Sequence, residues 1–107
     1  MKIIIVGAFA IGTHLAKLLS RDHDDITLID SDPERLAKIG NDFDLLTIEA
    51  SPTSVKALKQ AGAQDADLFI AVTPDENTNM TACVLAKALG AAKTVAKIDS
   101  AEYVEPE

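Results

Sequence analysis

Short apolar runs recur at regular intervals along the chain, and each of them is rich in β-branched residues. The runs cover residues 3–6, 26–29, 45–48, 68–72 and 94–98. None of them alternates cleanly between apolar and polar residues. Continuous apolar strands of this kind are covered on both faces, so the pattern predicts a mostly parallel sheet with helices on each side.

The segments between the runs have the apolar spacing of helices. On residues 10–20, one face of the expected helix carries Ile11, Leu15, Leu18 and Leu19. The longest helix is expected to begin at Pro74-Asp75-Glu76 and to run to Gly90. Its acidic first turn suits the positive end of the helix dipole.

Two shorter helices carry start and stop signals of their own. Asp32 is the expected N-cap of the first, with Pro33 in its first turn and Gly40 at its end. Ser51-Pro52 repeats this arrangement before a helix that Gly62 is expected to stop. The apolar residues expected to point inward from these two helices are Leu36, Ile39, Val55 and Leu58.

Together these elements predict one Rossmann-like α/β domain over residues 1–107. Its sheet is expected to be doubly wound and parallel, with five strands in the order 3-2-1-4-5. Another helix is expected to begin at residues 100–103, close to the end of the chain. We therefore expect the C-terminal part of the fold to be truncated, or to belong to a larger protein.

Composition and charge narrow the class of protein. The 107 residues are 48% hydrophobic and 25% charged, which is typical of a globular domain. Ten Lys and Arg residues against seventeen Asp and Glu give a net charge of −7, which argues against nucleic-acid binding. The single cysteine, Cys83, suits a reducing compartment. The apolar runs are far shorter than the ~20 residues needed to insert into a membrane, so we expect a cytoplasmic domain.

The turn after the first apolar run has the spacing of a dinucleotide-binding loop. Such a loop places glycine first, third and sixth, for a tight turn, close approach to a pyrophosphate, and close packing of helix on strand. Its residues here are Gly7, Ala8, Phe9, Ala10, Ile11 and Gly12. Because Phe9 replaces the middle glycine, we expect its ring to take up volume meant for phosphate or ribose. It would also be strained if the turn needed a positive φ there.

Asp30 is the candidate ribose-binding carboxylate. It ends the second apolar run and follows Gly12 by 30 − 12 = 18 residues, close to the usual spacing of about 20. A carboxylate at this place would bind ribose hydroxyls and repel a 2′-phosphate. The alternative is that Asp30 is a turn residue in an Asp-rich segment.

Several segments in the same order resemble the N-terminal nucleotide-binding domain, called RCK, of the Trk/Ktr potassium-uptake regulatory proteins. The similar segments are residues 1–8, 11–19, 25–30, 61–83 and 96–104. The most specific pieces are Ala61-Gly62 followed by Asp65-Ala66-Asp67, then Ala71-Val72-Thr73, then Glu76 with Asn79-Met80. The resemblance covers nearly the whole chain.

The resemblance implies a cytoplasmic regulatory domain that binds NAD(H) or an adenine nucleotide, pairs as a homodimer and controls a membrane potassium transporter. It implies that the loop from Gly7 to Ile11 faces the pyrophosphate and that Asp30 faces the ribose. It also implies that Thr73 lines the far side of the cleft and that Lys97 lies near the nucleotide. Thr73 could equally cap the long helix, and Lys97 could extend from a sheet edge towards solvent.

The sequence departs from the family pattern at two places around the expected cleft. Besides Phe9, Ala50 stands where the family usually has a glycine, and Glu49 adds negative charge beside it. We therefore expect nucleotide binding to be impaired, or no nucleotide to be bound. The alternatives are an engineered or ligand-free interaction module on the same fold, and the cofactor half of a dehydrogenase.

Other chemistry is not indicated. His14 lies on the first expected helix and His23 lies in an Asp-rich turn, but the carboxylates of that turn are consecutive and do not converge on a metal ion. Cys83 is expected to be a buried packing thiol. The sequence offers no general acid or base opposite the cleft, so we expect no catalytic residues and no enzyme activity. Residues 75–89 are apolar around most of the expected helix, which favours a homodimer with this helix or the C-terminal end of the chain in its interface.

Overall fold

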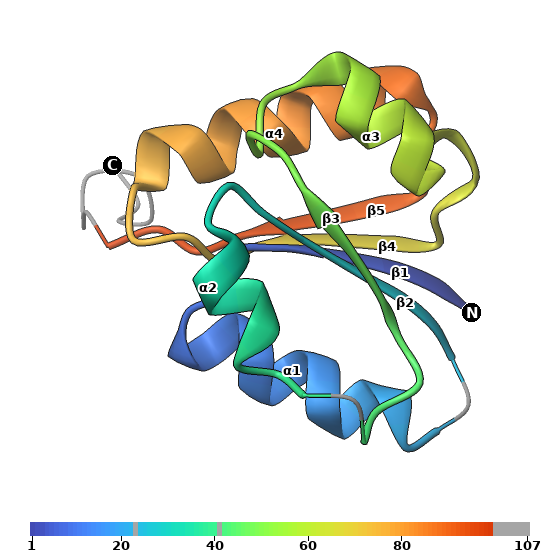
Figure 1. The fold of residues 1–107 in the computed structure, drawn as a ribbon. Coiled ribbons are helices and arrows are strands. Elements are labelled where there is room, and N and C mark those ends of the chain that lie inside the picture. Colours follow the sequence, from blue (N-terminus) through green and yellow to red (C-terminus); the bar gives the residue numbers. More distant parts are fainter. Residues whose placement is uncertain (23, 41, 100–107) are drawn as a thin grey trace.

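The described residues form five strands and four α-helices that alternate along the sequence (Figure 1). The computed structural model describes residues 1–22, 24–40 and 42–99. The elements are β1 Lys2–Val6, α1 Ala10–Ser20, β2 Asp25–Asp30, α2 Pro33–Ala37, β3 Leu46–Glu49, α3 Val55–Ala61, a 3₁₀ turn Ala63–Asp65, β4 Leu68–Ala71, α4 Glu76–Leu89 and β5 Lys93–Ala96. All neighbouring strands pair in parallel in the order β3-β2-β1-β4-β5. The predicted fold class and strand order are confirmed; the helix expected at residues 100–103 lies outside the described residues.

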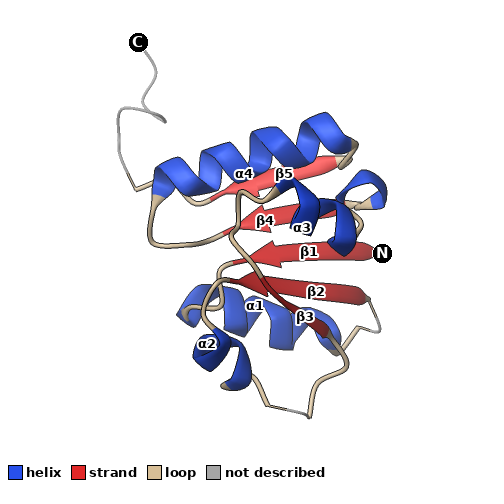
Figure 2. Ribbon diagram, turned by 45° about the horizontal axis from the view of Figure 1, so that its top comes forward, coloured by secondary structure: helices blue, strands red, loops and turns tan. Residues whose placement is uncertain are grey.

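The helices cover the sheet in two layers, with α1 and α2 on one face and α3 and α4 on the other (Figures 1 and 2). Successive residues of β1 point to opposite faces. Ile3 and Ile5 belong to the core beneath α1 and α2, and Ile4 and Val6 to the core beneath α3 and α4. This is why the central strands need continuous apolar runs.

The two edge strands are less covered than the apolar runs predict. Leu46 in β3 is 66% exposed, and Lys93 and Val95 in β5 are also exposed. An edge strand has a neighbour on one side only, so it needs less apolar surface than β1, β2 or β4. The expectation of coverage on both faces is therefore right for the central strands and wrong for the edges.

The first helix also differs from its predicted packing. α1 has the predicted bounds, but Ile11 and Leu18 are exposed, and its buried residues are Gly12 and Ala16. Small residues let the helix axis come close to the sheet. The face of α1 that packs against the sheet is therefore the one with the smallest side chains. A Cβ on Gly12 would overlap the carbonyl oxygen of Gly7, as expected for the sixth position of the loop.

The third helix begins later than its sequence signals predict. Its N-cap is Ser54, whose hydroxyl accepts a hydrogen bond from the backbone N–H of Ala57 at 3.1 Å. Ser51 instead accepts from the N–H of Thr53 in the preceding turn. Val55 is consequently exposed rather than inward-facing, whereas Leu58 is fully buried. Gly62 ends the helix in the left-handed conformation, as predicted.

The remaining two helices follow their signals closely. Asp32 and Asp75 cap the starts of α2 and α4 through their carboxylates. α2 ends at Ala37, before Gly40, yet Leu36 and Ile39 are both buried as expected. Over the described part of the chain, no helix combines the length and the apolar character that crossing a bilayer requires.

Replacing Gly12 should be far more destructive than replacing a glycine in open space. We expect Gly12→Ala to lower the free energy of unfolding by at least about 3 kcal/mol, because the added Cβ would push α1 off the Gly7 turn. Gly40→Ala is the control: Gly40 has a φ of +78° and its Cβ would meet no atom within 4 Å, so only backbone strain of about 1–2 kcal/mol is expected. Urea unfolding measures both, and equal losses would contradict the close contact.

Candidate functional site

The loop after β1 lies at the carboxyl ends of the strands, where the strand order reverses direction. Val6 pairs with Ile29 of β2 on one side and with Ala71 of β4 on the other, so the three strands finish level. Gly7 then turns with a φ of +106°, and a Cβ there would come within 3.0 Å of the backbone nitrogen of Thr73. Both features require glycine, as the loop pattern predicts. In a doubly wound sheet, this is the place where ligands bind.

Phe9 occupies the middle position of the loop without backbone strain. Its φ of −89° and ψ of −169° are extended values that any residue adopts, so the strain considered from the sequence is not present. The Phe9 ring lies beside the guanidinium of Arg35, whose Cζ atom is 4.2 Å from the ring centroid. That distance places the pair within the range of a cation–π contact. The side chain therefore contributes to the wall of the cleft.

Asp30 ends β2 and is only 2% exposed. Its Oδ2 accepts a hydrogen bond from the N–H of Ala8 at 2.8 Å, and its Oδ1 accepts from the N–H of Asp32 at 2.8 Å. The Nε of Arg35 lies 3.1 and 3.2 Å from the two carboxylate oxygens, and Nη2 of Arg35 lies 3.0 Å from Oδ1. The carboxylate thus joins the loop after β1 to α2.

Two opposing effects act on the pKa of Asp30. Burial by itself raises this pKa, but the hydrogen bonds from Arg35, Ala8 and Asp32, with the positive charge of Arg35, hold it below its usual value. Asp30 is therefore ionised at neutral pH. Removing one partner of a buried ion pair is strongly destabilising, because the remaining charge is buried without compensation.

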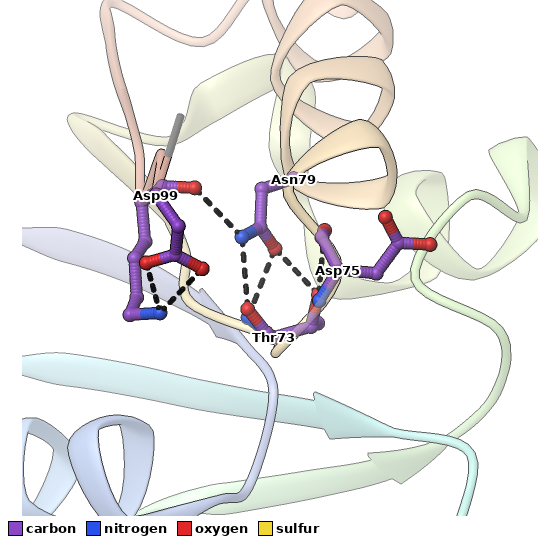
Figure 3. Close-up of polar contacts among 5 residues, drawn as sticks. Thr73, Asp75, Asn79 and Asp99 are labelled. Carbon is purple, nitrogen blue, oxygen red and sulfur yellow. Dashed lines mark hydrogen bonds and ion pairs between the residues drawn. The ribbon is translucent and has the colours of Figure 1, made fainter. Parts of the chain in front are cut away.

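Asn79, which is 1% exposed on α4, lies behind the opposite wall of the cleft and holds Thr73 of that wall in place (Figure 3). Its Oδ1 accepts hydrogen bonds from the N–H of Thr73 at 2.9 Å and from the hydroxyl of Thr73 at 2.7 Å. Its Nδ2 donates to the carbonyl oxygens of Thr73 and Lys97, both at 2.9 Å. One amide therefore ties together the ends of β4, α4 and β5.

Thr73 and Lys97 both serve local structure at this wall. The Thr73 hydroxyl accepts a hydrogen bond from the N–H of Asp75 at 3.2 Å, at the start of α4, which matches the capping alternative. Thr73 also lines the cleft. The ammonium of Lys97 lies 2.9 Å from a carboxylate oxygen of Asp99. Of the predicted site residues, Phe9, Asp30 and Thr73 line the cleft. The predicted residues that do not line it are Gly7, Ala8, Ala10, Ile11, Gly12 and Lys97.

The cleft is a cavity of about 240 Å³ between these two walls. Its lining includes Phe9, Asp30 and Arg35 on one side and Thr73, Asp75 and Thr78 on the other. Small-molecule sites usually measure about 300–1,000 Å³, so the cleft in this conformation is small for a nucleotide. Larger cavities lie elsewhere, including one of about 500 Å³ between the α2 segment and β3.

Comparison with known proteins decides the family. The family model for the TrkA-N domain matches residues 3–106. The chain belongs to the TrkA-N family. The Trk system potassium uptake protein TrkA of Haemophilus influenzae is 43% identical over 105 residues, which are 97% of this chain and 23% of that protein. The TrkA homolog of Archaeoglobus fulgidus is 33% identical over 98% of this chain and 24% of its own length. The resemblance noted from the sequence is confirmed.

The TrkA-N chain thus spans about a quarter of the length of these relatives. Two solved structures share its fold. The NAD(P)-binding domain of an exopolyphosphatase-related protein from Archaeoglobus fulgidus has a TM-score of 0.79 and 16% identity, over 96% of this chain and 77% of that one. The Kef C-terminal domain of Shewanella denitrificans in its AMP-bound form has a TM-score of 0.73 and 20% identity, over 87% and 55%.

Two important residues of this TrkA-N domain are not found by sequence reasoning. The helical pattern places Arg35 on a helix and assigns it no role, although a cation five residues after a buried carboxylate is a usable signal. Asn79 lies in the segment that carries the family resemblance, but its role depends on contacts with β4 and β5. Periodicity alone does not show such a contact.

Cys83 is buried in the TrkA-N domain, and its burial raises the pKa of the thiol, as expected of a packing cysteine rather than a nucleophile. His14 is exposed on α1, and His23 lies outside the described residues. Within the described ranges, His, Cys, Asp and Glu side chains form no group of three that could hold a metal ion.

The contact between Asp30 and Arg35 should make stability depend on pH in a defined direction. Because the folded-state pKa of Asp30 is lowered, its contribution to stability is present above the unfolded-state pKa of about 4 and is lost as the pH falls through the folded-state pKa. Arg35→Met should therefore be less stable than the unaltered domain at pH 7, and this difference should shrink at pH 3. Urea unfolding at the two pH values measures it.

Arg21→Met is the matched control, since Arg21 is exposed at the end of α1. Its effect on stability should change little between the two pH values. A difference for Arg35→Met that stays constant, or grows on acidification, would show that Arg35 does not stabilise the ionised carboxylate.

Proposed function

We propose that this domain is the nucleotide-sensing part of a potassium uptake regulator, and that NAD(H) or an adenine nucleotide binds at the cleft. The observation that carries this proposal is the Gly7 turn against Thr73, with Asp30 at the end of β2 beside it. These parts have the order and spacing of a dinucleotide-binding loop. The names of the relatives supply the connection to potassium uptake.

The proposed role is regulatory rather than catalytic. Asp30 and Asp75 are the carboxylates among the described residues that line the cleft. Asp30 is held by Arg35, and Asp75 caps α4 by accepting from the N–H of Asn77 and the hydroxyl of Thr78. Acid–base catalysis needs a group that is free to exchange its proton with substrate. A dehydrogenase fragment is therefore the less favoured interpretation.

Nucleotide binding should be weaker than in a relative with glycine at position 9. The ring of Phe9 lines the cleft, and the cavity it leaves is about 240 Å³. Ala50, at the other substituted glycine position, packs against the core beneath α3 and α4, and its N–H donates to the carbonyl oxygen of Asp30 at 3.0 Å. Of the two substitutions, Phe9 is thus the one that obstructs a ligand directly.

A ligand-free interaction module is the second candidate. Its support is that the polar groups of the cleft already have partners within the domain, since Arg35 contacts both Asp30 and Phe9. On this interpretation the domain keeps the fold as a platform for assembly. Binding of a nucleotide separates the two candidates.

Assembly forms part of the proposal. We place the domain in the cytoplasm, beside a membrane potassium transporter, as a homodimer that pairs through α4. Val84 on α4 is 68% exposed, and with Cys83, Lys87, Ala88 and Thr94 of β5 it lines a groove of about 360 Å³. A second copy of the same chain would bury this apolar face about a two-fold axis. Nucleotide binding would then bias how the copies pack.

Removing the Phe9 ring should restore binding. We expect Phe9→Gly to bind NADH, ADP or ATP at least about tenfold more tightly than the unaltered domain, because the backbone regains close approach to phosphate. Isothermal titration calorimetry measures the affinities. Phe9→Leu is the matched control, since it keeps bulk at the same place and should therefore regain much less affinity than Phe9→Gly. Micromolar NADH binding by the unaltered domain would refute the obstruction.

The assembly can be tested by light scattering coupled to size exclusion. We expect a homodimer at micromolar concentration, at twice the 11.3 kDa mass of one chain. Val84→Glu should shift it to the monomer, because a charge would be buried in the apolar interface. Val55→Glu, at an exposed valine of α3, should leave the dimer intact. A mass of one chain throughout this concentration range would exclude the dimer.

A further inference from the structure

Asp30, the carboxylate expected to bind the ribose, is covered by Arg35 of the same chain. The side chain of Asp30 is only 3% exposed, whereas that of Arg35 above it is 31% exposed. Both residues line the cleft, and the guanidinium of Arg35 lies 3.0 Å from Oδ1 of Asp30. A ribose can therefore reach Asp30 only if Arg35 moves.

The hydrogen-bonding capacity of Asp30 is also largely used. Two backbone N–H groups, from Ala8 and Asp32, take one acceptor position on each oxygen. The Nε and Nη2 groups of Arg35 take further positions on the same oxygens, at 3.0 to 3.2 Å. The backbone donors belong to the fold and cannot leave without breaking the loop. Arg35 is the partner that a ribose diol would have to replace.

Three side chains hold Arg35 in this place. Besides Asp30, the carboxylate of Asp32 lies 3.2 Å from Nη1, and the ring of Phe9 lies against the guanidinium. Arg35 carries a planar group that can bridge carboxylates and stack on an aromatic ring at the same time. Phe9 thus has a second effect besides its bulk, because it stabilises the residue that covers Asp30.

We propose that Arg35 is an internal competitor for the ribose of the ligand, and so determines both the affinity of the cleft and its selectivity for ribonucleotides. This inference rests on the proposed nucleotide-binding function. While Arg35 is bound to Asp30, Asp30 cannot accept hydrogen bonds from the ribose hydroxyls. A ribonucleotide and its 2′-deoxy form then bind with similar affinity. When Arg35 is displaced, Asp30 accepts from the diol and the two forms are distinguished.

The test compares ADP with 2′-deoxy-ADP by calorimetry on the unaltered domain and on Arg35→Met. We expect the unaltered domain to bind both weakly and within about threefold of each other. Arg35→Met should bind ADP at least about tenfold more tightly than the unaltered domain, and about tenfold more tightly than it binds 2′-deoxy-ADP. That is the change expected when a charged acceptor becomes available to a hydroxyl donor. Arg21→Met removes the same charge at an exposed site away from the cleft and should change neither affinity.

Arg35→Lys provides a second test in case the methionine variant does not fold. Lysine keeps the positive charge beside Asp30 but lacks the planar fork, so it should move both affinities in the same direction by a smaller factor. Thermal melting of each variant confirms that it is folded. If Arg35→Met or Arg35→Lys, once folded, binds ADP no better than the unaltered domain, the proposal is overturned. Weaker binding would show that Arg35 itself contacts the ligand.

Phe9→Gly separates failure of this inference from failure of the proposed function. If Phe9→Gly binds ADP while the Arg35 variants gain nothing, the cleft is a nucleotide site and only the competition by Arg35 is wrong. If neither Phe9→Gly nor the Arg35 variants bind NADH, ADP or ATP at millimolar concentration, both proposals fail.

Discussion

The ionised carboxylate of Asp30 is the interaction on which the rest of the cleft depends. A charge this deeply buried must be paired, or it would destabilise the fold. The N–H of Ala8 fixes the loop after β1, the N–H of Asp32 fixes the turn after β2, and Arg35 fixes α2. Because one group satisfies all three, the loop, the strand end and the second helix keep a single relative arrangement.

The other wall depends on a neutral group used in the same way. Asn79 offers one acceptor and two donors, and the backbone of Thr73 and Lys97 uses all of them. The ends of β4 and β5 would otherwise carry buried backbone groups without partners. The cleft therefore lies between a charged junction and an amide junction, and movement of either wall changes its width.

These junctions connect the cleft to the surface proposed for assembly. Asn79 lies on α4, the same helix that exposes Val84. Under the proposed function, a ligand that shifts Thr73 would act on Asn79 through these hydrogen bonds, and so on α4. A regulatory effect of this kind requires the ligand to bind two arrangements of the domain with different affinities.

Much of this protein was determined by the sequence itself. Continuous apolar runs specified the central strands, and the rule of right-handed crossovers gave their order. The signals at Asp32, Gly62 and Asp75 placed helix ends correctly, because each acts within a few residues of chain. Gly7 and Gly12 could be assigned for the same reason.

Tertiary structure decided the rest. The choice of Ser54 over Ser51 as a cap, the exposure of Ile11 and Leu18, and the roles of Arg35 and Asn79 depend on which segments meet. Periodicity reports which face of an element is apolar, but not how closely that element approaches its neighbour. The small residues Gly12 and Ala16 allow α1 to pack closely against the sheet. Burial of polar groups at the strand ends determined which of them had to pair.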